Sequence, residues 1–377
     1  MDLSLTEEQE MLKKMARDFL SSESPKSFVR EMEGDERGYT PELWKKMAEL
    51  GWMGLVIPEK YGGVGGSFLD LAILLEEMGR ALLPGPFFPT GVLSSLLISE
   101  AGSEEQKEDI LVKLANGELI STLALTEADG EYAAASINTE ASLDGDEYVI
   151  KGSKLFVSDA HVSDLMICVT RTTKDVSPEE GISLFLVESK SPGVSCTALR
   201  TLAKDKQYEV ILDQVRVPKN RVLGELNKGW FYIEKILTTA IVAKSIEMLG
   251  SAQQILEMTA EYTKERVQFG HPIGSYQAIQ HHCANMLIDV DGLRFLAYKT
   301  AWMISQGIPC LKEAYMTKAW AGDACRRVVN LGTQVHGGLG IMKEHDVQLY
   351  FRRIVGAELL LGSADFCRER VSQEIFA

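Results

Sequence analysis

The chain has 377 residues, 45% of them hydrophobic and 25% charged, and its formal charge is −15 at pH 7. This length predicts two or three domains. The composition is typical of a soluble globular protein, and the negative charge argues against nucleic acid or an anionic membrane as the main partner. No apolar run approaches the roughly 18–20 residues of a membrane span, and the first residues lack a signal-peptide pattern. We therefore expect a cytoplasmic protein.

The first third of the chain carries a helical pattern of apolar residues. Thr6, followed by acidic residues, predicts a helix start. Further helices are expected from Pro41 to Leu50 and from Leu69 to Leu83, before a break at Gly117. These features predict an N-terminal helical domain over residues 1–118.

The pattern changes after residue 118. Short β-rich runs such as Leu165–Thr170 and Ile182–Val187, separated by turn residues, fill residues 119–222. They predict a compact antiparallel β domain, either a sandwich or a barrel. Long helical patterns return over residues 223–377 and are typical of a helical bundle. The expected fold is therefore α+β, with a helical N-terminal domain, a middle antiparallel β domain and a C-terminal helical bundle.

The chain lacks the usual motifs for metals and phosphate loops. The glycine-rich loop at 62–66 has neither a preceding strand nor a following Lys-Ser/Thr pair. The six cysteines are scattered without a CxxC pair, and the segment HGGLGIMKEH lacks the i,i+4 histidine spacing of a zinc helix. We expect no metal site, and a reducing compartment fits the cysteine pattern.

The most informative segments are RVQFGHPIGSYQAIQ at 266–280 and QVHGGLG at 334–340. They place a cation, amide side chains and an aromatic ring at a helix–helix junction, which suits a large anionic cofactor with stackable rings. Together with four other segments they occur in the order found in acyl-CoA dehydrogenases, and nearly the whole chain resembles that family. The other four are LGWMGLVIPEKYGG (50–63), LALTEADG (123–130), IKGSKLFVSDAHVSD (150–164) and VLGELNKGW (222–230).

The resemblance implies an FAD enzyme with α–β–α architecture. Such an enzyme removes a proton from Cα and a hydride from Cβ of an acyl-CoA thioester, and an electron-transfer flavoprotein is its expected electron acceptor. Four residues match positions that bind the flavin ring. The backbone of Leu125 and the hydroxyl of Thr126 would bond the ring, Phe156 would pack beside it, and Ser158 would be a polar contact. Donors at these edges stabilise a reduced flavin. The alternative is that Thr126 only caps a strand end.

The resemblance assigns a second set of cofactor residues to a neighbouring subunit's flavin. Arg266 and Gln268 would meet the pyrophosphate through charge-assisted bonds, and Phe269 would pack on the ADP portion. The remaining members of the set are Gln277, Gln334, Gly337 and Gly338. The alternative is that Arg266 is a solvated charge at a helix end.

The family pattern is altered at two places. Members usually follow Thr-Glu with a small-residue run ending in Gly-Ser-Asp, whereas this chain places Asp129 and Glu131 there. Carboxylates beside a pyrophosphate are unfavourable unless they turn away or are neutralised, which questions FAD binding in this chain's own cleft. The usual catalytic glutamate is also absent, because Leu361 and Ala240 occupy its two known positions.

Three carboxylates could replace that base. Glu247 lies seven residues after Ala240, hence on the same helix face and about 10 Å along the axis. Its apolar surroundings would raise its pKa toward that of a useful base. The alternative is a structural glutamate paired with Lys244 or Arg266. Glu358 and Asp365 are the other two candidates.

Three functional hypotheses follow from this uneven pattern. The first is an acyl-CoA dehydrogenase subunit in an α₂β₂ hetero-oligomer with a paralogous partner that supplies the base and the ring-binding strand. Its divergent motifs resemble subunits that act on bulky, cyclic or dicarboxylic acyl-CoAs. The second is a homo-oligomeric enzyme with a relocated base, Glu247 first. The third is a catalytically silent assembly subunit.

Overall fold

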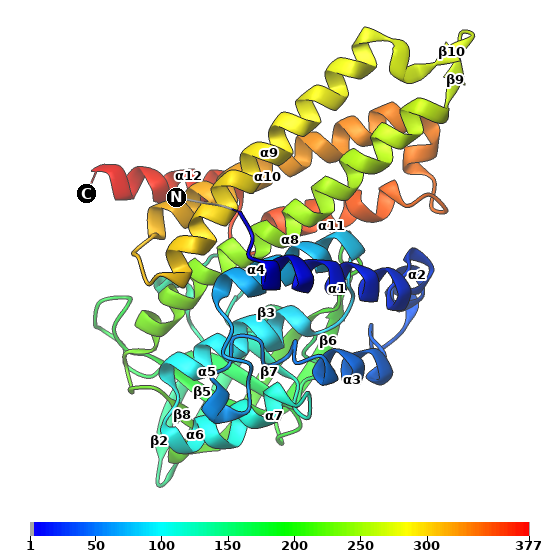
Figure 1. Ribbon diagram of the computed structural model, residues 1–377. Helices are drawn as coiled ribbons and strands as arrows, with labels where there is room; N and C mark the ends of the chain where they lie inside the picture. Colours follow the sequence, from blue (N-terminus) through cyan, green and yellow to red (C-terminus); the bar gives the residue numbers. More distant parts are fainter. Residues whose placement is uncertain (1–3, 377) are drawn as a thin grey trace.

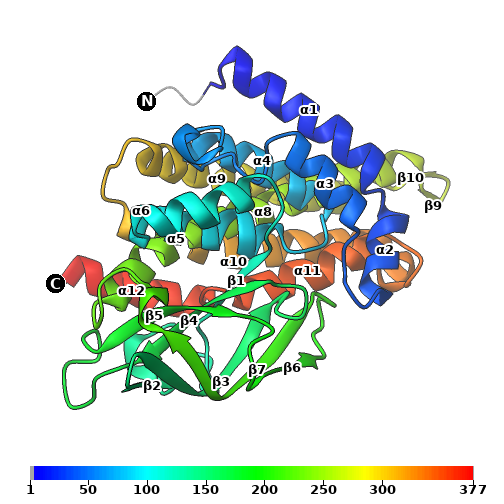
Figure 2. The same cartoon turned by 90° about the horizontal axis from the view of Figure 1, so that it is seen from below.

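Helices occupy both ends of the chain and strands its middle (Figure 1). The computed structural model describes residues 4–376. Seen from below, the sheet lies on one side of the C-terminal helices, and the first helices lie on the opposite side (Figure 2). The α+β fold with a central β domain is confirmed. Within residues 4–376, no helix combines the length and the apolar character that crossing a bilayer requires.

The N-terminal helices begin at the residues that their capping signals predict. The Thr6 and Ser67 hydroxyls each accept the third backbone N–H of their helix in a full capping box, and Thr40 caps a helix that starts with proline. The α-helices of this region are α1 (Glu7–Glu23), α2 (Lys26–Gly34), α3 (Pro41–Glu49), α4 (Phe68–Ala81), α5 (Ser95–Ala101), α6 (Glu104–Gln106) and α7 (Val112–Ala115).

The middle strands form one eight-stranded sheet within the described residues. Its order is β6-β7-β3-β2-β4-β5-β8, with β1 beside β4. Most neighbours are antiparallel as expected, but β4 pairs in parallel with both β1 and β2, so the sheet is mixed. The strands are β1 (Ser121–Ala124), β2 (Glu140–Asp144), β3 (Glu147–Ser158), β4 (Leu165–Arg171), β5 (Ile182–Glu188), β6 (Val194–Leu199), β7 (Gln207–Pro218) and β8 (Val222–Leu223). The expected domain boundary at 222/223 falls inside β8.

Long helices make up the C-terminal part. A short hairpin, β9 (Val267–Gln268) and β10 (His271–Pro272), joins α8 to α9 and projects from the end of the bundle (Figure 1). The α-helices of this part are α8 (Gly229–Glu265), α9 (Gln277–Ser305), α10 (Leu311–His336), α11 (Val347–Leu359) and α12 (Ala364–Phe376).

Two glycines let α4 and α8 touch through their backbones. A Cβ on Gly79 would lie 1.9 Å from the Glu247 carbonyl oxygen, and one on Gly250 would lie 1.8 Å from the Glu76 carbonyl oxygen. No side chain fits at those distances. The Ser251 hydroxyl also donates to the Gly79 carbonyl oxygen at 2.8 Å. This close crossing fixes one wall of the pocket described next.

Candidate active site

Two adjoining pockets lie where the sheet meets α4, α8 and α11. The first, with a cavity volume of about 110 Å³ and partly open to solvent, is lined by residues of α4 and α8 and by Ser158. The second, with a cavity volume of about 390 Å³, is lined by Thr126 and Phe156 among others and is mostly apolar. We call them the acyl pocket and the ring pocket. They share the lining residues Ala203, Asp205, Gly356 and Leu360.

A bulge in β3 presents Phe156 to the ring pocket. The pairing of β3 with β7 shifts register between Lys154 and Val157, and Phe156 has φ 56°, in the left-handed region. A bulky residue seldom adopts this conformation, and a bulge commonly redirects a side chain beside a functional site. As a result the ring is 46% exposed and lines the pocket.

A buried ion pair holds the segment that carries Leu125 and Thr126. Lys154, completely buried, donates to Glu127 Oε1 at 2.7 Å and to the Leu125 carbonyl oxygen at 3.1 Å. The Glu127 carboxylate also accepts the backbone N–H groups of Asn138 and Thr139 at 2.9 Å. Burial tends to raise the pKa of Glu127, but Lys154 and these donors hold it below its usual range. Lys154 therefore positions the backbone expected to meet a flavin ring.

Ser158 and the ring-pocket segment are tied together by backbone contacts. The Leu155 N–H donates to the Thr126 carbonyl oxygen at 2.8 Å, and the Thr122 hydroxyl donates to the Ser158 carbonyl oxygen at 2.7 Å. Thr126 and Phe156 thus line one pocket while Ser158 lines the other. The structure brings together this first set of predicted cofactor residues.

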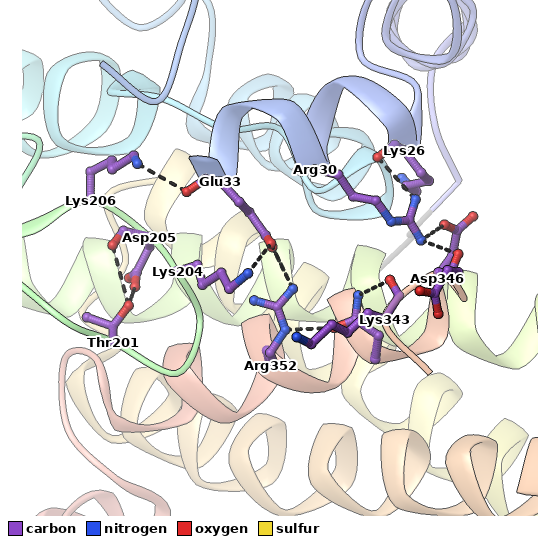
Figure 3. A network of polar contacts seen from close by, with 12 residues as sticks. Lys26, Arg30, Glu33, Thr201, Lys204, Asp205, Lys206, Lys343, Asp346 and Arg352 are labelled. Atoms are coloured by element: carbon purple, nitrogen blue, oxygen red, sulfur yellow. Dashed lines mark hydrogen bonds and ion pairs between the residues drawn. The ribbon is translucent and has the colours of Figure 1, made fainter. Parts of the chain in front are cut away.

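The loop between β6 and β7 forms the wall shared by the two pockets, and α2 and α11 anchor it (Figure 3). The Glu33 carboxylate accepts from Arg352 at 2.7 Å and pairs with Lys204 at 3.4 Å. Lys206 donates to the Glu33 carbonyl oxygen at 3.3 Å. Asp205 accepts the Thr201 hydroxyl at 2.5 Å. These contacts connect the pocket wall to the N-terminal domain.

Glu247 lines the acyl pocket, as a replacement base should, but its carboxylate is already engaged. Lys244 donates to Glu247 Oε2 at 2.6 Å, and the Lys244 ammonium also lies over the Phe88 ring, 3.8 Å from its centroid. This is the structural pairing that the sequence left open as an alternative. Glu247 remains a prediction as catalytic base.

The two usual base positions are apolar and buried. Ala240 is fully buried in α8, and Leu361 is buried with φ 63°. A buried lysine orders the loop after Leu361: Lys318 Nζ donates to the carbonyl oxygens of Glu358 at 2.7 Å and Gly362 at 3.0 Å. A cation at a helix C-terminus satisfies its free carbonyls. Burial lowers the pKa of Lys318 to about 8.

The other two candidate carboxylates do not line either pocket. Glu358 is buried and accepts the Ala364 backbone N–H at 3.4 Å. Asp365 is exposed and pairs with Arg368 at 2.5 Å. Neither is placed to contact a molecule bound in the acyl pocket.

The acidic residues that replace the usual small-residue run face solvent. Asp129 and Glu131 are both exposed, and the Asp129 carboxylate accepts the Glu131 backbone N–H at 3.2 Å. Carboxylates near a phosphate are tolerated when they turn away from it. The solvent-facing orientation of Asp129 and Glu131 meets this condition. Tyr132 lines the ring pocket beside Thr126 and the Leu361 backbone, and its burial raises its pKa.

The sequence did not single out Asp159, the residue after Ser158. Its side chain is 7% exposed and lines the acyl pocket, and its φ is 53°. Burial and the neighbouring Asp205 carboxylate raise the pKa of Asp159 to about 7, while Arg353 acts to lower it. The Nε of Arg353 is buried without a hydrogen-bond partner in residues 4–376. The only signal in the sequence was the adjacency of Asp159 to a predicted ring contact.

The second predicted set of cofactor residues lies on the surface, away from both pockets. Arg266 is the C-cap of α8, and the Phe269 side chain, in the turn between β9 and β10, is 92% exposed. The Arg266 guanidinium has no ion pair or hydrogen bond within the described chain. We call this set the clasp; its other members, Gln268, Gln277, Gln334, Gly337 and Gly338, are exposed as well.

Distance along α8 separates the clasp from the pockets. Arg266 lies nineteen positions after Glu247, which is on the pocket wall, and this corresponds to about 28 Å at 1.5 Å per residue. None of the clasp residues lines either pocket. The structure therefore brings together the first set of predicted residues and does not bring the clasp to it.

The fold is a three-part α–β–α arrangement with two adjoining pockets. Family models for the N-terminal, middle and C-terminal domains of acyl-CoA dehydrogenases match residues 6–118, 122–215 and 227–376. The chain belongs to the acyl-CoA dehydrogenase family.

Three similar proteins illustrate the match. The probable acyl-CoA dehydrogenase YngJ of Bacillus subtilis (strain 168) is 33% identical over 381 residues, with 100% of both chains covered. A crystal structure of an acyl-CoA dehydrogenase from Geobacillus kaustophilus is 28% identical with a TM-score of 0.93, covering 99% of both chains. The ChsE4-ChsE5 complex from Mycobacterium tuberculosis is 28% identical with a TM-score of 0.90, covering 100% of this chain and 99% of that one.

Members of this family are FAD-dependent flavoproteins that oxidise acyl-CoA thioesters, and the residues present fit that cofactor. The ring pocket offers an aromatic wall and the Thr126 hydroxyl, and its volume suits a planar ring system. The exposed, unpaired Arg266 guanidinium suits a pyrophosphate. When bound, FAD accepts the hydride from the substrate Cβ. In such enzymes the protein orients the thioester, excludes water and takes the Cα proton.

The raised pKa of Asp159 predicts that stability falls as the pH rises from about 4 to about 7. The folded state holds the Asp159 proton more tightly than the unfolded state, so its contribution is complete below the ordinary pKa of 3.8 and is lost through about 7. The loss is roughly 4 kcal/mol at most. Denaturant unfolding at pH 5 and pH 8 measures it, with Asp159→Asn as comparison. The variant should gain stability relative to wild type at pH 8; identical pH dependence in both proteins would contradict this assignment.

Proposed function

We propose that this chain is a subunit of an acyl-CoA dehydrogenase whose flavin sites are shared between chains. The observation that carries this proposal is the clasp. It is exposed, its Arg266 side chain has no ion pair or hydrogen bond within the described residues, and it lies far along α8 from the acyl pocket. An arginine without an ion pair beside a 92% exposed phenylalanine suits a cofactor held by a neighbour. The reciprocal arrangement brings a neighbour's clasp to this chain's ring pocket.

The proposed neighbour is a paralogous subunit in an α₂β₂ assembly. Leu361 and Ala240 leave the two usual base positions without a proton acceptor, so a partner that retains the glutamate would supply a complete site. The similarity to the ChsE4-ChsE5 complex supports this choice, because that protein is named as a complex of two components. An electron-transfer flavoprotein is the proposed electron acceptor, in the cytoplasm.

The proposed substrate is the CoA thioester of a bulky, cyclic or dicarboxylic acid. The support for this proposal is the lining of the acyl pocket. Its inner wall carries Lys244, Arg353 and Ser251, which can meet a polar substituent. Aliphatic side chains of α4 line the remaining wall.

A homo-oligomer is the second candidate function. It is favoured by one observation, the intact ring pocket with Thr126 and Phe156 in this chain. In this case each copy supplies both half-sites, and a carboxylate of the acyl pocket is the base, Glu247 being the first prediction. A silent assembly subunit is less consistent with the exposed clasp.

Flavin content separates these proposals. The chain is purified alone and after co-expression with a paralogous subunit, and absorbance at 450 nm per chain is compared. We expect little FAD in the chain alone and stoichiometric FAD with acyl-CoA oxidation in the hetero-assembly. One FAD per chain with full acyl-CoA dehydrogenase activity in the chain alone would contradict the hetero-oligomer and favour the homo-oligomer.

A further inference from the structure

The carboxylate of Asp159 lines the acyl pocket without a direct partner. Its side chain is 7% exposed, and neither carboxylate oxygen has a hydrogen bond or ion pair within residues 4–376. Its backbone is fixed, because its N–H donates to the Lys206 carbonyl oxygen at 2.7 Å. A buried carboxylate is normally hydrogen-bonded, so one that lines a pocket without a partner suggests a role toward a bound molecule.

The position of Asp159 places it beside the reacting end of a substrate. It follows Ser158 directly, and Phe156, two residues earlier, reaches the ring pocket. The acyl and ring pockets adjoin along Ala203 and Asp205. An acyl group whose Cα–Cβ bond lies against a flavin ring therefore has this carboxylate on the wall next to it.

The charged groups facing Asp159 come from three elements. Asp205 and Lys206 lie in the β6–β7 loop, Arg353 on α11 and Lys244 on α8. Burial and Asp205 raise the pKa of Asp159 to about 7, against the effect of the three cations. A base that is half ionised near neutral pH is present in its proton-accepting form and still has a high proton affinity. Glu247 lines the same pocket, but Lys244 holds its carboxylate at 2.6 Å.

We propose that Asp159 accepts the Cα proton of the acyl-CoA thioester in this chain's own pocket, a role that rests on the proposed dehydrogenase function. The Cα–H bond breaks, its proton passes to a carboxylate oxygen of Asp159, and its electron pair becomes the Cα=Cβ bond. The hydride leaving Cβ carries two electrons to the flavin that the family's activity supplies. The product is the α,β-unsaturated thioester, and Asp159 is left protonated until solvent restores it.

Hydrogen–deuterium exchange at Cα tests the proton step separately from turnover. The FAD-loaded assembly is incubated in D₂O with 3-phenylpropanoyl-CoA, and NMR follows the loss of the Cα proton signal. Asp159→Asn is expected to reduce the exchange rate about a hundredfold or more, while FAD content and thioester binding stay at wild-type values. Asparagine accepts a left-handed backbone, so the variant should fold. Asp159→Ser is a second variant with the same expectation.

Two further variants sharpen the result. Asp213→Asn, an exposed aspartate on β7 outside both pockets, is the matched control and should exchange at the wild-type rate. Wild-type exchange should rise with pH through an apparent pKa near 7. Exchange in Asp159→Asn within threefold of wild type, or its loss in Glu247→Gln alone, would overturn the assignment to Asp159. Wild-type protein that neither exchanges Cα protons nor bleaches at 450 nm would overturn the proposed function as well.

Discussion

Replacing Lys154 with methionine will lower the free energy of unfolding by about 3–5 kcal/mol, because it leaves Glu127 buried without its counter-charge. The Lys154 ammonium is fully buried and bonds both Glu127 and the Leu125 carbonyl oxygen. Its loss should also loosen the Leu125–Thr126 segment of the ring pocket. Denaturant unfolding followed by circular dichroism measures the first effect, and FAD affinity measures the second.

The matched control is Lys174→Met, which removes a lysine from an exposed pair with Glu140 at 2.6 Å. Solvent screens such a pair, so its removal should leave the unfolding curve nearly unchanged. Equal destabilisation by both substitutions would show that the buried pair has no special part in holding the ring pocket.

Replacing Arg266 with alanine should reduce FAD affinity of the assembly about 10- to 150-fold, the equivalent of roughly 1.5–3 kcal/mol for a charged hydrogen bond. Because Arg266 is exposed and has no partner in its own described chain, the fold should be unaffected. Absorbance at 450 nm during stepwise dialysis measures retention of FAD.

A neighbouring lysine provides the control for charge alone. Lys264 lies two residues before Arg266 and pairs with Glu261 at 2.6 Å on the exposed end of α8. Lys264→Ala should retain FAD as wild type does. A decrease of the same size in both variants would attribute the effect to general surface charge and would contradict a specific clasp.

The sequence predicted the fold and suggested the clasp because both inferences depend on local signals. Thr6 and the proline at 41 define helix starts through their own backbone, and the 266–280 motif is contiguous. The mixed character of the sheet was harder to predict from the sequence, because the parallel pairing of β1 with β4 joins residues more than forty positions apart. Nothing local in either strand specifies that partner.

The candidate site was predicted only in part, and for the same reason. Lys154 falls on the buried side of β3, and the alternation of that strand could have indicated a lysine needing a buried partner. Its pairing with Glu127 across 27 positions could not be read from spacing. The electrostatic surroundings of Asp159 are set by Asp205, Arg353 and Lys244. These residues come from other elements of the fold. Burial and three-dimensional neighbours, rather than residue type, distinguish Asp159 from Glu247.

Flavin retention in an assembly with one blocked ring pocket tests most directly whether the clasp acts on a neighbouring chain. A Cβ on Gly356 would lie 2.8 Å from the Ala203 Cβ, so Gly356→Phe should fill the space between the two pocket walls. Tagged Gly356→Phe chains are co-assembled with an unmodified partner, and FAD per assembly is measured with and without Arg266→Ala in the blocked chain. The shared site predicts that the blocked assembly keeps the partner's FAD and loses it when Arg266→Ala is added. Unchanged FAD content on adding Arg266→Ala would contradict the account.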